Sequence, residues 1–175
     1  MQKVGLILEG VGTKGIFTAS ALDCLQVNSI YLLYVLPVLL EPVMQSIMFL
    51  IWMVVLQMKS PIRHAIELGY EKNIVILLKE KGYREKDLPG LKVLSRVLYN
   101  TYLKLIESLD SRISRYNESL CYLEALERKG KVFVISPSKV LIDRASSNRN
   151  QIHVFYQQGY SLAKDRLEEI KKFIN

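Results

Sequence analysis

Cysteine and histidine are scarce in this sequence. Its 175 residues include two of each, which lie far apart at Cys24, Cys121, His64 and His153. No C-x-x-C pair occurs, so a disulfide framework is excluded and a metal cluster of histidine and cysteine ligands is strongly disfavoured. We therefore expect no metal site and no cofactor. Two isolated thiols also favour a reducing, cytoplasmic location.

Charge is nearly absent from the first third of the chain. Residues 1–58 contain two basic and three acidic residues, so their net charge is 2 − 3 = −1, and the remainder carries 22 − 14 = +8. A basic half favours anionic surfaces such as phospholipid headgroups. Its basic residues are interspersed with acidic ones, so a solvated surface is the alternative. The solvated surface is the simpler explanation, and the pattern also allows a lipid or membrane surface as partner; no nucleic acid is expected, and the oligomeric state stays open.

Residues 36–60 form an anomalous apolar segment. Glu41 is the single charged residue between residues 26 and 58, and residues 42–58 form an uncharged run of seventeen. That length lies at the lower limit for a transmembrane helix, and a buried core helix is the alternative. Pro37 and Pro42 interrupt any single helix through the region. With residues 30–58 as an apolar anchor, the chain would be a small membrane-associated or binding protein, peripheral to a membrane.

Apolar runs of strand length alternate with helical patterns along the chain. Strands are predicted at residues 4–8, 31–36, 73–78 and 131–135. Helices are predicted at residues 16–25, 61–68, 91–109, 117–129 and 161–174, with a polar loop at residues 143–150. Strands that alternate with helices indicate an α/β fold with a parallel sheet.

A glycine-rich turn, EGVGTKG at residues 9–15, lies between the first predicted strand and the first predicted helix. Gly10, Gly12 and Gly15 fit G-x-G-x-x-G, the pattern of a dinucleotide-binding turn. That function requires an acidic residue at the end of the second strand, and residues 31–40 contain none. A Walker loop is excluded because Lys14 precedes a glycine where Ser or Thr is required. A nucleotide-binding module is therefore the weaker alternative.

The same turn resembles the oxyanion loop of bacterial patatin-like phospholipases, usually E-G-G-G-x-R/K-G. Residues 61–83, 115–137 and 159–173 resemble further segments of that family. The resemblance implies a three-layer α/β/α fold and a serine-type lipid acyl hydrolase, whose loop N–H groups stabilise charge on an ester oxygen. It assigns the remnant of the oxyanion hole to Gly10, Val11, Gly12, Lys14 and Gly15. Val11 stands where the family has glycine, and its branched side chain would narrow the hole.

The catalytic groups of that family are missing from the corresponding positions. Its nucleophilic serine lies in a G-x-S-x-G turn after the second strand. That position holds Leu39, which has no nucleophilic atom. Its aspartate lies in an Asp-Gly turn, and no Asp-Gly occurs in the chain. The sequence therefore predicts a truncated, catalytically inactive member of the family, with no catalytic residue.

The resemblance also divides the chain into a partial α/β core at residues 1–83 and a helical region with one strand at residues 84–175. The second part would lie in the same domain or form a subdomain. Because the core lacks part of the family's sheet, we expect exposed edges on the strands at residues 4–8 and 73–78, and poor soluble expression.

A shifted reading frame is a further explanation of the apolar segment. Read one base earlier, the codons of Trp52, Met53 and Val54 encode Asp-Gly, the motif that is missing. Residues 39–58 would then be an accident of frame, not a membrane span. The nucleotide sequence across codons 30–65 tests this hypothesis.

Overall fold

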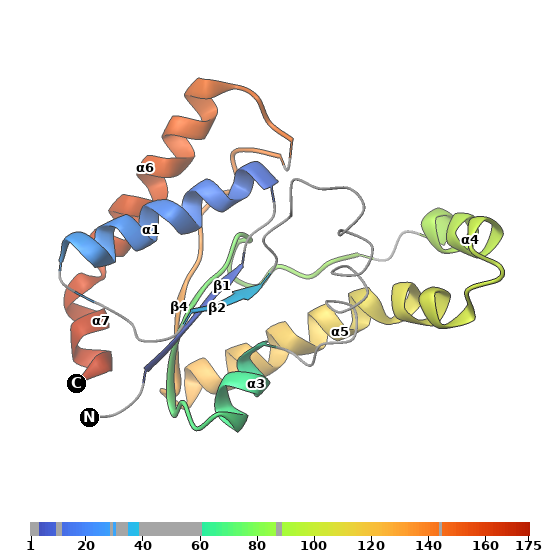
Figure 1. Ribbon diagram of the computed structural model, residues 1–175. Coiled ribbons are helices and arrows are strands. Elements are labelled where there is room, and N and C mark those ends of the chain that lie inside the picture. Colours follow the sequence, from blue (N-terminus) through green and yellow to red (C-terminus); the bar gives the residue numbers. More distant parts are fainter. Residues whose placement is uncertain are drawn as a thin grey trace.

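A four-stranded parallel sheet lies at the centre of the molecule (Figure 1). The computed structural model describes residues 4–9, 12–28, 30, 35–38, 61–86, 89–143 and 145–175. Within them the strands are β1 (Val4–Glu9), β2 (Val35–Val38), β3 (Lys72–Ile76) and β4 (Val132–Ile135), in the order β2-β1-β3-β4. The order reverses between β1 and β3, because β2 and β3 lie on opposite sides of β1. The prediction of an α/β fold is confirmed.

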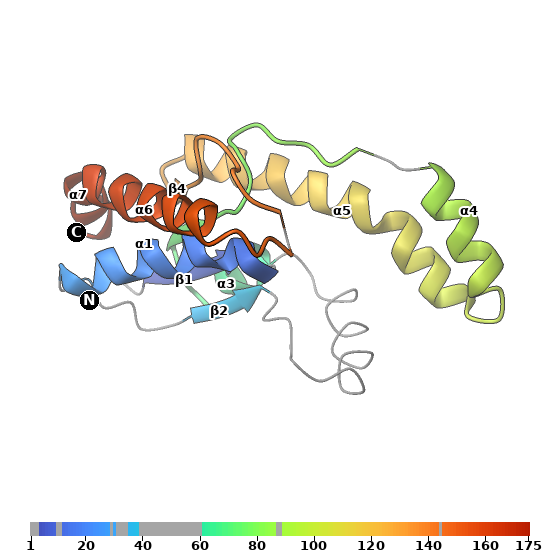
Figure 2. The same cartoon turned by 90° about the horizontal axis from the view of Figure 1, so that it is seen from above.

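Helices cover both faces of the sheet (Figures 1 and 2). One face carries α1 (Gly15–Val27), α6 (Arg149–Asp165) and α7 (Leu167–Ile174). The other carries α3 (Pro61–Glu67) and α5 (Leu103–Arg128). The remaining helix, α4 (Pro89–Leu98), and the first turns of α5 project beyond these layers (Figure 2).

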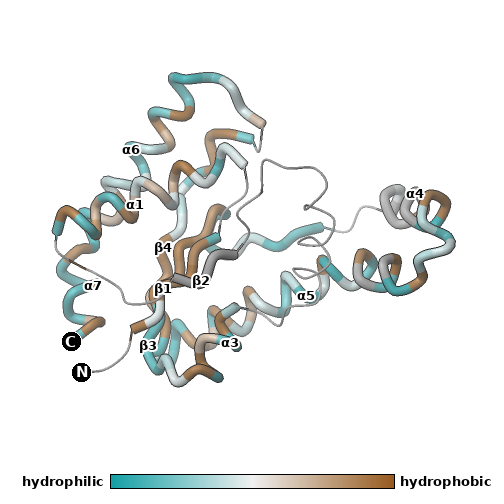
Figure 3. Tube along the Cα trace, in the orientation of Figure 1, coloured by the Kyte–Doolittle hydropathy of each residue, from teal (hydrophilic) through white to brown (hydrophobic). Residues whose placement is uncertain are grey.

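β1, β3 and β4 are apolar along most of their length because both faces of the sheet are covered there, and their polar residues lie at strand ends, Glu9 in β1 and Lys72 and Asn73 in β3. Leu6 and Ile74 belong to the core beneath α1 and α6, whereas Ile7 and Val75 belong to the core beneath α3 and α5. Successive side chains of a strand point to opposite faces, so a strand covered on both sides is apolar at most positions and does not alternate with polar residues. β1, β3 and β4 are accordingly among the hydrophobic parts of the chain trace (Figure 3).

The expectation of open edges on the first and third strands is wrong. β1 and β3 are the two inner strands, each with a hydrogen-bonded neighbour on both sides. The outer strand β4 has its free edge partly covered by a side chain. Arg166 Nη1 donates to the carbonyl oxygen of Val134 at 2.8 Å, and the guanidinium lies 4.2 Å from the centre of the Phe133 ring. A cation over an edge strand discourages pairing with another chain.

We expect Arg166→Ala to lower the free energy of unfolding by about 1–3 kcal/mol, because it leaves a part-buried carbonyl without its charged donor. It should also increase light scattering on warming, since the edge of β4 is then open. Arg63→Ala is the matched control. Arg63 pairs with Glu118 at 3.4 Å and lies 4.4 Å from the Tyr122 ring centre, but caps no strand. Equal effects of the two substitutions in urea denaturation would contradict the capping role.

The long helix α5 differs from its sequence pattern. The helix predicted at residues 91–109 is divided by a turn at residues 99–102, and α5 then continues unbroken past Asn117, where a new helix is predicted. Asn117 does not cap a helix. Its side chain accepts a hydrogen bond from the backbone N of Glu85 and donates one to the backbone O of Glu85, both at 2.9 Å. Asn117, at which the sequence pattern predicts the start of a helix, therefore makes a tertiary contact with the loop at Glu85 instead.

The helix α6 begins inside the predicted polar loop. Asn148 is its N-cap, and the side-chain oxygen accepts from the backbone N of Asn150 at 3.1 Å and of Gln151 at 3.3 Å. Its fully buried positions recur every fourth residue but include glycine and alanine, at Phe155, Gly159 and Ala163. Such small residues give only a weak apolar stripe, which explains why the hydrophobic pattern at residues 149–160 does not predict a helix.

Some predictions fall partly outside the described residues. The second strand is present as β2, later in the chain than the predicted 31–36, and residues 31–34 and 39–60 are not described. Among the helices that are described, none combines the length and the apolar character needed to cross a bilayer. The proposed division of the chain at residues 83 and 84 stays a prediction.

Candidate functional site

The glycine turn leads from β1 directly into α1. A 3-10 turn, η1 (Gly12–Lys14), is followed at once by Gly15, the first residue of α1. Gly12 has φ 51°, a left-handed conformation that a side chain would strain. Gly15 has no heavy atom within 4 Å of the position that a Cβ would take, so packing does not require glycine there. Backbone geometry thus explains the glycine at position 12, whereas neither backbone geometry nor packing requires one at position 15.

The structure brings together three of the predicted site residues at the start of α1. Gly12 and Gly15 lie beside Lys14, whose side chain is buried and is not presented to solvent. Gly10, Val11 and Leu39 lie outside the described residues. The role of this turn as an oxyanion hole stays a prediction.

Glu9 connects the carboxyl end of β1 to two other elements. Its Oε2 accepts a hydrogen bond from the backbone N–H of Leu78, just after β3, at 2.7 Å. Its Oε1 accepts a hydrogen bond from the Tyr116 hydroxyl on α5 at 3.1 Å. Its backbone O accepts one from the Thr18 hydroxyl on α1 at 2.8 Å. One residue therefore joins both central strands to a helix on each face of the sheet.

The Tyr116 hydroxyl is held in its neutral form. Burial and the adjacent Glu9 carboxylate raise the pKa of Tyr116 far above its ordinary value of 10.0. Both causes disfavour a phenolate, because the negative form would lose water and face a second negative charge. At neutral pH this pair is therefore a structural donor and acceptor, not a general acid and base.

This arrangement bears on the nucleotide-binding alternative. In open α/β sheets, ligands bind outside the carboxyl ends of the strands where the strand order reverses, which here is between β1 and β3. At that place the Glu9 carboxylate already accepts the hydrogen bond from the backbone N–H of Leu78. An incoming phosphate would meet a negative charge already seated there, which argues against a nucleotide site.

Two side chains of α1 with nucleophilic atoms, Ser20 and Cys24, are buried and are not open to a substrate. Ser20 is fully buried and donates to the backbone O of Phe17 at 2.8 Å. Burial raises the pKa of the Cys24 thiol, which keeps it protonated. Cys121 is exposed on α5, with its Sγ 3.5 Å from Arg84 Nη2. Over the described ranges, no three His, Cys, Asp or Glu side chains are grouped so that they could hold a metal ion.

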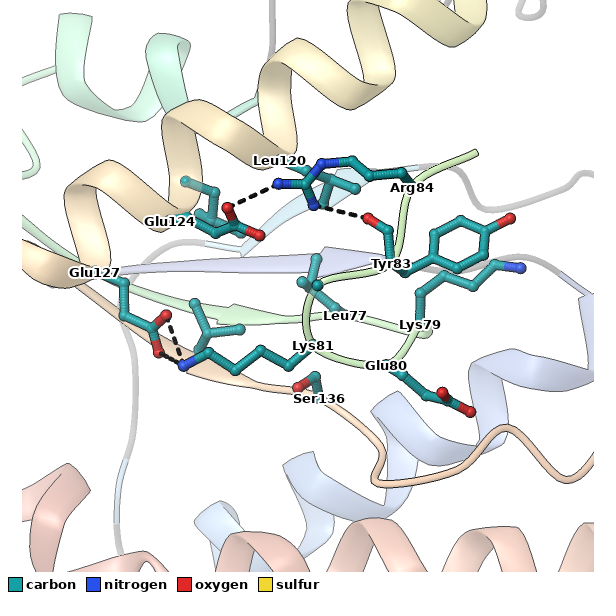
Figure 4. Close-up of a pocket in the computed structure, with 13 residues that line it drawn as sticks. Leu77, Lys79, Glu80, Lys81, Tyr83, Arg84, Leu120, Glu124, Glu127 and Ser136 are labelled. Atoms are coloured by element: carbon teal, nitrogen blue, oxygen red, sulfur yellow. Dashed lines mark hydrogen bonds and ion pairs between the residues drawn. The ribbon is translucent and has the colours of Figure 1, made fainter. Parts of the chain in front are cut away.

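A small depression lies between α5 and the loop after β3 (Figure 4). Its volume of about 20 Å³ suits a water molecule and not an organic ligand. Two ion pairs cross it, from Lys81 to Glu127 at 2.9 Å and from Arg84 to Glu124 at 2.7 Å. The hydrogen bond with Arg84 lowers the pKa of Glu124 and raises that of Arg84. These charged groups pair with one another, so the two ion pairs fasten the loop after β3 to α5.

Among the described residues, exposed apolar side chains gather on the projection formed by residues 89–106, which we call the hairpin tip. It contains α4, the turn at residues 99–102 and the start of α5. Six apolar or aromatic side chains of the tip are exposed, by 40% to 73%: Val93, Val97, Leu98, Tyr99, Tyr102 and Leu103. A soluble domain seldom gathers so many large apolar side chains on one exposed feature, and such patches mark interaction sites.

Sequence reasoning missed the hairpin tip as a surface. The apolar residues at positions 91, 94 and 98 predict one buried stripe, but Val93 and Val97 add apolar residues on a second side of α4. A helix that is apolar on more than one side needs more than one partner. That feature was readable in the sequence, whereas the projection of the tip beyond the layered core was not.

The comparisons with known proteins give one match. Residues 102–175, less than half of the chain, match the family model described as "Domain of unknown function (DUF6363)". This region begins in the hairpin tip and includes α5, β4, α6 and α7. No curated protein and no solved structure matches the chain.

The expectation of a patatin-like phospholipase is wrong by these comparisons. No model of that family matches, and the matching model carries no assigned function. The physical reason is that a strand, a glycine turn and a helix recur in many parallel α/β folds. Short segments of that kind indicate the local backbone shape, which the structure shows, without specifying a family.

Proposed function

We propose that this protein is a non-catalytic, peripheral lipid-binding protein that attaches to a membrane surface through the hairpin tip. The observation that carries the proposal is the exposure of four aliphatic and two tyrosine side chains there, Val93, Val97, Leu98, Tyr99, Tyr102 and Leu103. Apolar side chains that enter the boundary between headgroups and acyl chains leave water, which favours binding. Tyrosine is enriched at the same depth because its ring is apolar and its hydroxyl is polar.

The rest of the structure supports a binding role over an enzymatic one. Glu9 occupies the place where α/β sheets bind their ligands, and its carboxylate is held by Leu78 and Tyr116. The layered core then serves as a rigid base for the tip. Polar contacts along α5, among them the Arg84–Glu124 pair, fasten that helix to the core.

A vesicle-binding experiment tests the proposal with a matched pair of substitutions. We expect the protein to sediment with vesicles of phosphatidylcholine and phosphatidylglycerol, and Val97→Glu to weaken binding about tenfold or more. The reason is that Val97, which would enter the membrane, is replaced by a charged side chain that stays in water. Val154→Glu is the control, because Val97 is 68% exposed on the tip and Val154 is 53% exposed on α6.

Both substitutions add one negative charge, but the charge at residue 97 lies nearer the vesicle, so the comparison is repeated with vesicles of phosphatidylcholine alone, whose surface has no net charge, to separate lost insertion from repulsion. Circular dichroism should show that both variants keep their helices, since both sites are exposed. No sedimentation of the wild-type protein, or equal weakening by the two substitutions, would refute attachment through the tip.

A further inference from the structure

The hairpin tip carries charge of one sign only. Residues 89–106 contain Lys92, Arg96 and Lys104 and no Asp or Glu, so their net charge is +3. Acidic residues begin immediately afterwards, at Glu107 and Asp110. The exposed apolar side chains and the basic ones thus occupy the same projection, and of the acids that follow, Asp110 pairs with Arg96 of the tip.

Two of these basic groups are open to solvent. Lys104 is exposed at the start of α5. Arg96 is 63% exposed and donates through Nη2 to Asp110 Oδ2 at 2.8 Å. A guanidinium has five N–H donors, so this bond to Asp110 leaves most of them for another acceptor. Arginine and lysine beside apolar residues are the composition of helices that lie on anionic bilayers.

We infer that the hairpin tip selects anionic phospholipids over zwitterionic ones, with Arg96 and Lys104 at the phosphate level and the aliphatic side chains below it. This inference rests on the proposed function and adds the chemical class of the lipid. Each basic side chain near an anionic surface contributes attraction that salt screens.

A second copy of the chain is a poorer occupant of the same surface. A two-fold symmetric contact brings the same patch of both molecules together. The basic residues of one tip would then face those of the other, and the Asp110 carboxylate, already paired with Arg96, offsets only part of that charge. Like charges brought together at an interface are unfavourable, whereas an anionic membrane neutralises them.

Nucleic acid also offers negative charge but does not suit the apolar part of the tip. Stacking on bases would use Tyr99 and Tyr102. It would leave Val93, Val97 and Leu103 exposed or pressed against polar phosphates. The aliphatic side chains therefore favour a lipid.

The test compares three probes: vesicles of phosphatidylcholine alone, vesicles that also contain phosphatidylglycerol, and an RNA oligonucleotide. We expect tighter binding to the anionic vesicles, with affinity that falls as salt rises. Lys104→Gln should weaken that binding about fivefold and leave binding to phosphatidylcholine unchanged. Lys129→Gln is the control, because Lys129 is exposed at the opposite end of the same helix.

The outcomes separate the inference from the proposed function. Equal affinity for both vesicles, with no effect of Lys104→Gln, would overturn anionic selectivity while the loss caused by Val97→Glu still supported lipid attachment. Absence of binding to every vesicle would overturn both. RNA binding that depends on Lys104 and is indifferent to Val97→Glu would replace the lipid with nucleic acid.

Discussion

Replacing Glu9 by alanine is expected to lower the free energy of unfolding by about 2–4 kcal/mol. The substitution removes the acceptor of two part-buried hydrogen bonds, one from the Leu78 N–H at 2.7 Å and one from the Tyr116 hydroxyl at 3.1 Å. Each donor is left without its partner, and the cost of an unsatisfied buried donor exceeds the net gain of the original bond. Because Glu9 links β1, β3 and α5, we expect loss of stability throughout the core.

Urea denaturation followed by circular dichroism measures this effect. Glu9→Gln is the matched control, since its amide oxygen can accept from Leu78 and its size is unchanged, so it should lose less than half as much. The idea of a central connecting carboxylate fails if Glu9→Ala and Glu9→Gln are equally stable, or if neither differs from the wild type.

The alkaline limb of the stability profile gives a second readout of the same contact. The pKa of Tyr116 in the folded protein is raised above its ordinary value of 10.0 by burial and by Glu9. A raised pKa contributes stability that is complete below the ordinary value and is lost as the pH rises above it, because the unfolded chain ionises first. Burial still raises the pKa of Tyr116 in Glu9→Ala, but less than burial and Glu9 together, so the gap in stability between wild type and variant should narrow well above pH 10.0, where Tyr116 ionises in the folded variant and not yet in the wild type. A constant gap would contradict the link between the two residues.

Gly159→Val is expected to destabilise the protein by about 3 kcal/mol, because it forces α6 away from α1. A Cβ at Gly159 would come within 2.7 Å of the backbone O of Phe17, and it would also overlap Ser20 Oγ. The Ser20 side chain can rotate, but the carbonyl of Phe17 belongs to α1 and moves only with its helix. The Phe17 and Phe155 rings, 5.2 Å apart between centroids, would lose their contact as the helices separate.

Gly90→Val is the control for this substitution. Gly90 lies in α4 with no heavy atom within 4 Å of an added Cβ. Its replacement should change stability by about 0.5 kcal/mol or less, since valine is no worse than glycine in a helix. Thermal unfolding of both variants decides the matter, and a Gly159→Val protein as stable as Gly90→Val would show that α1 and α6 are not closely packed.

Local sequence patterns predicted the elements and the fold class of this protein. The largely apolar runs at residues 4–8, 73–78 and 131–135 predicted strands of an α/β sheet, and β1, β3 and β4 lie at these places. The turn at residues 10–15 was predicted from its glycines, and in the structure Gly12 has the left-handed conformation that favours glycine. Such patterns can be recognised in a sequence because side chains return to the same face of a helix or strand at a fixed residue spacing.

The candidate site depended on contacts between distant residues. The sequence placed Glu9 in an oxyanion turn, whereas the structure uses its carboxylate to join β1 to Leu78 and Tyr116, 69 and 107 positions away. No local pattern predicts those partners, because strand order alone brings β3 beside β1. The glycine turn likewise did not specify a family, since many α/β sheets share its backbone.

Composition and periodicity by themselves determined that this chain forms a parallel α/β sheet with a basic second half. Only the tertiary structure decided which apolar residues are core and which are surface. Leu120 and Leu123 of α5 are buried against the sheet, while Leu103 of the same helix is 73% exposed. The physical reason is that a residue of a helix is buried only where the sheet lies beneath it. The extent of the sheet decides which turns of α5 are covered, and the sequence of α5 does not contain that information.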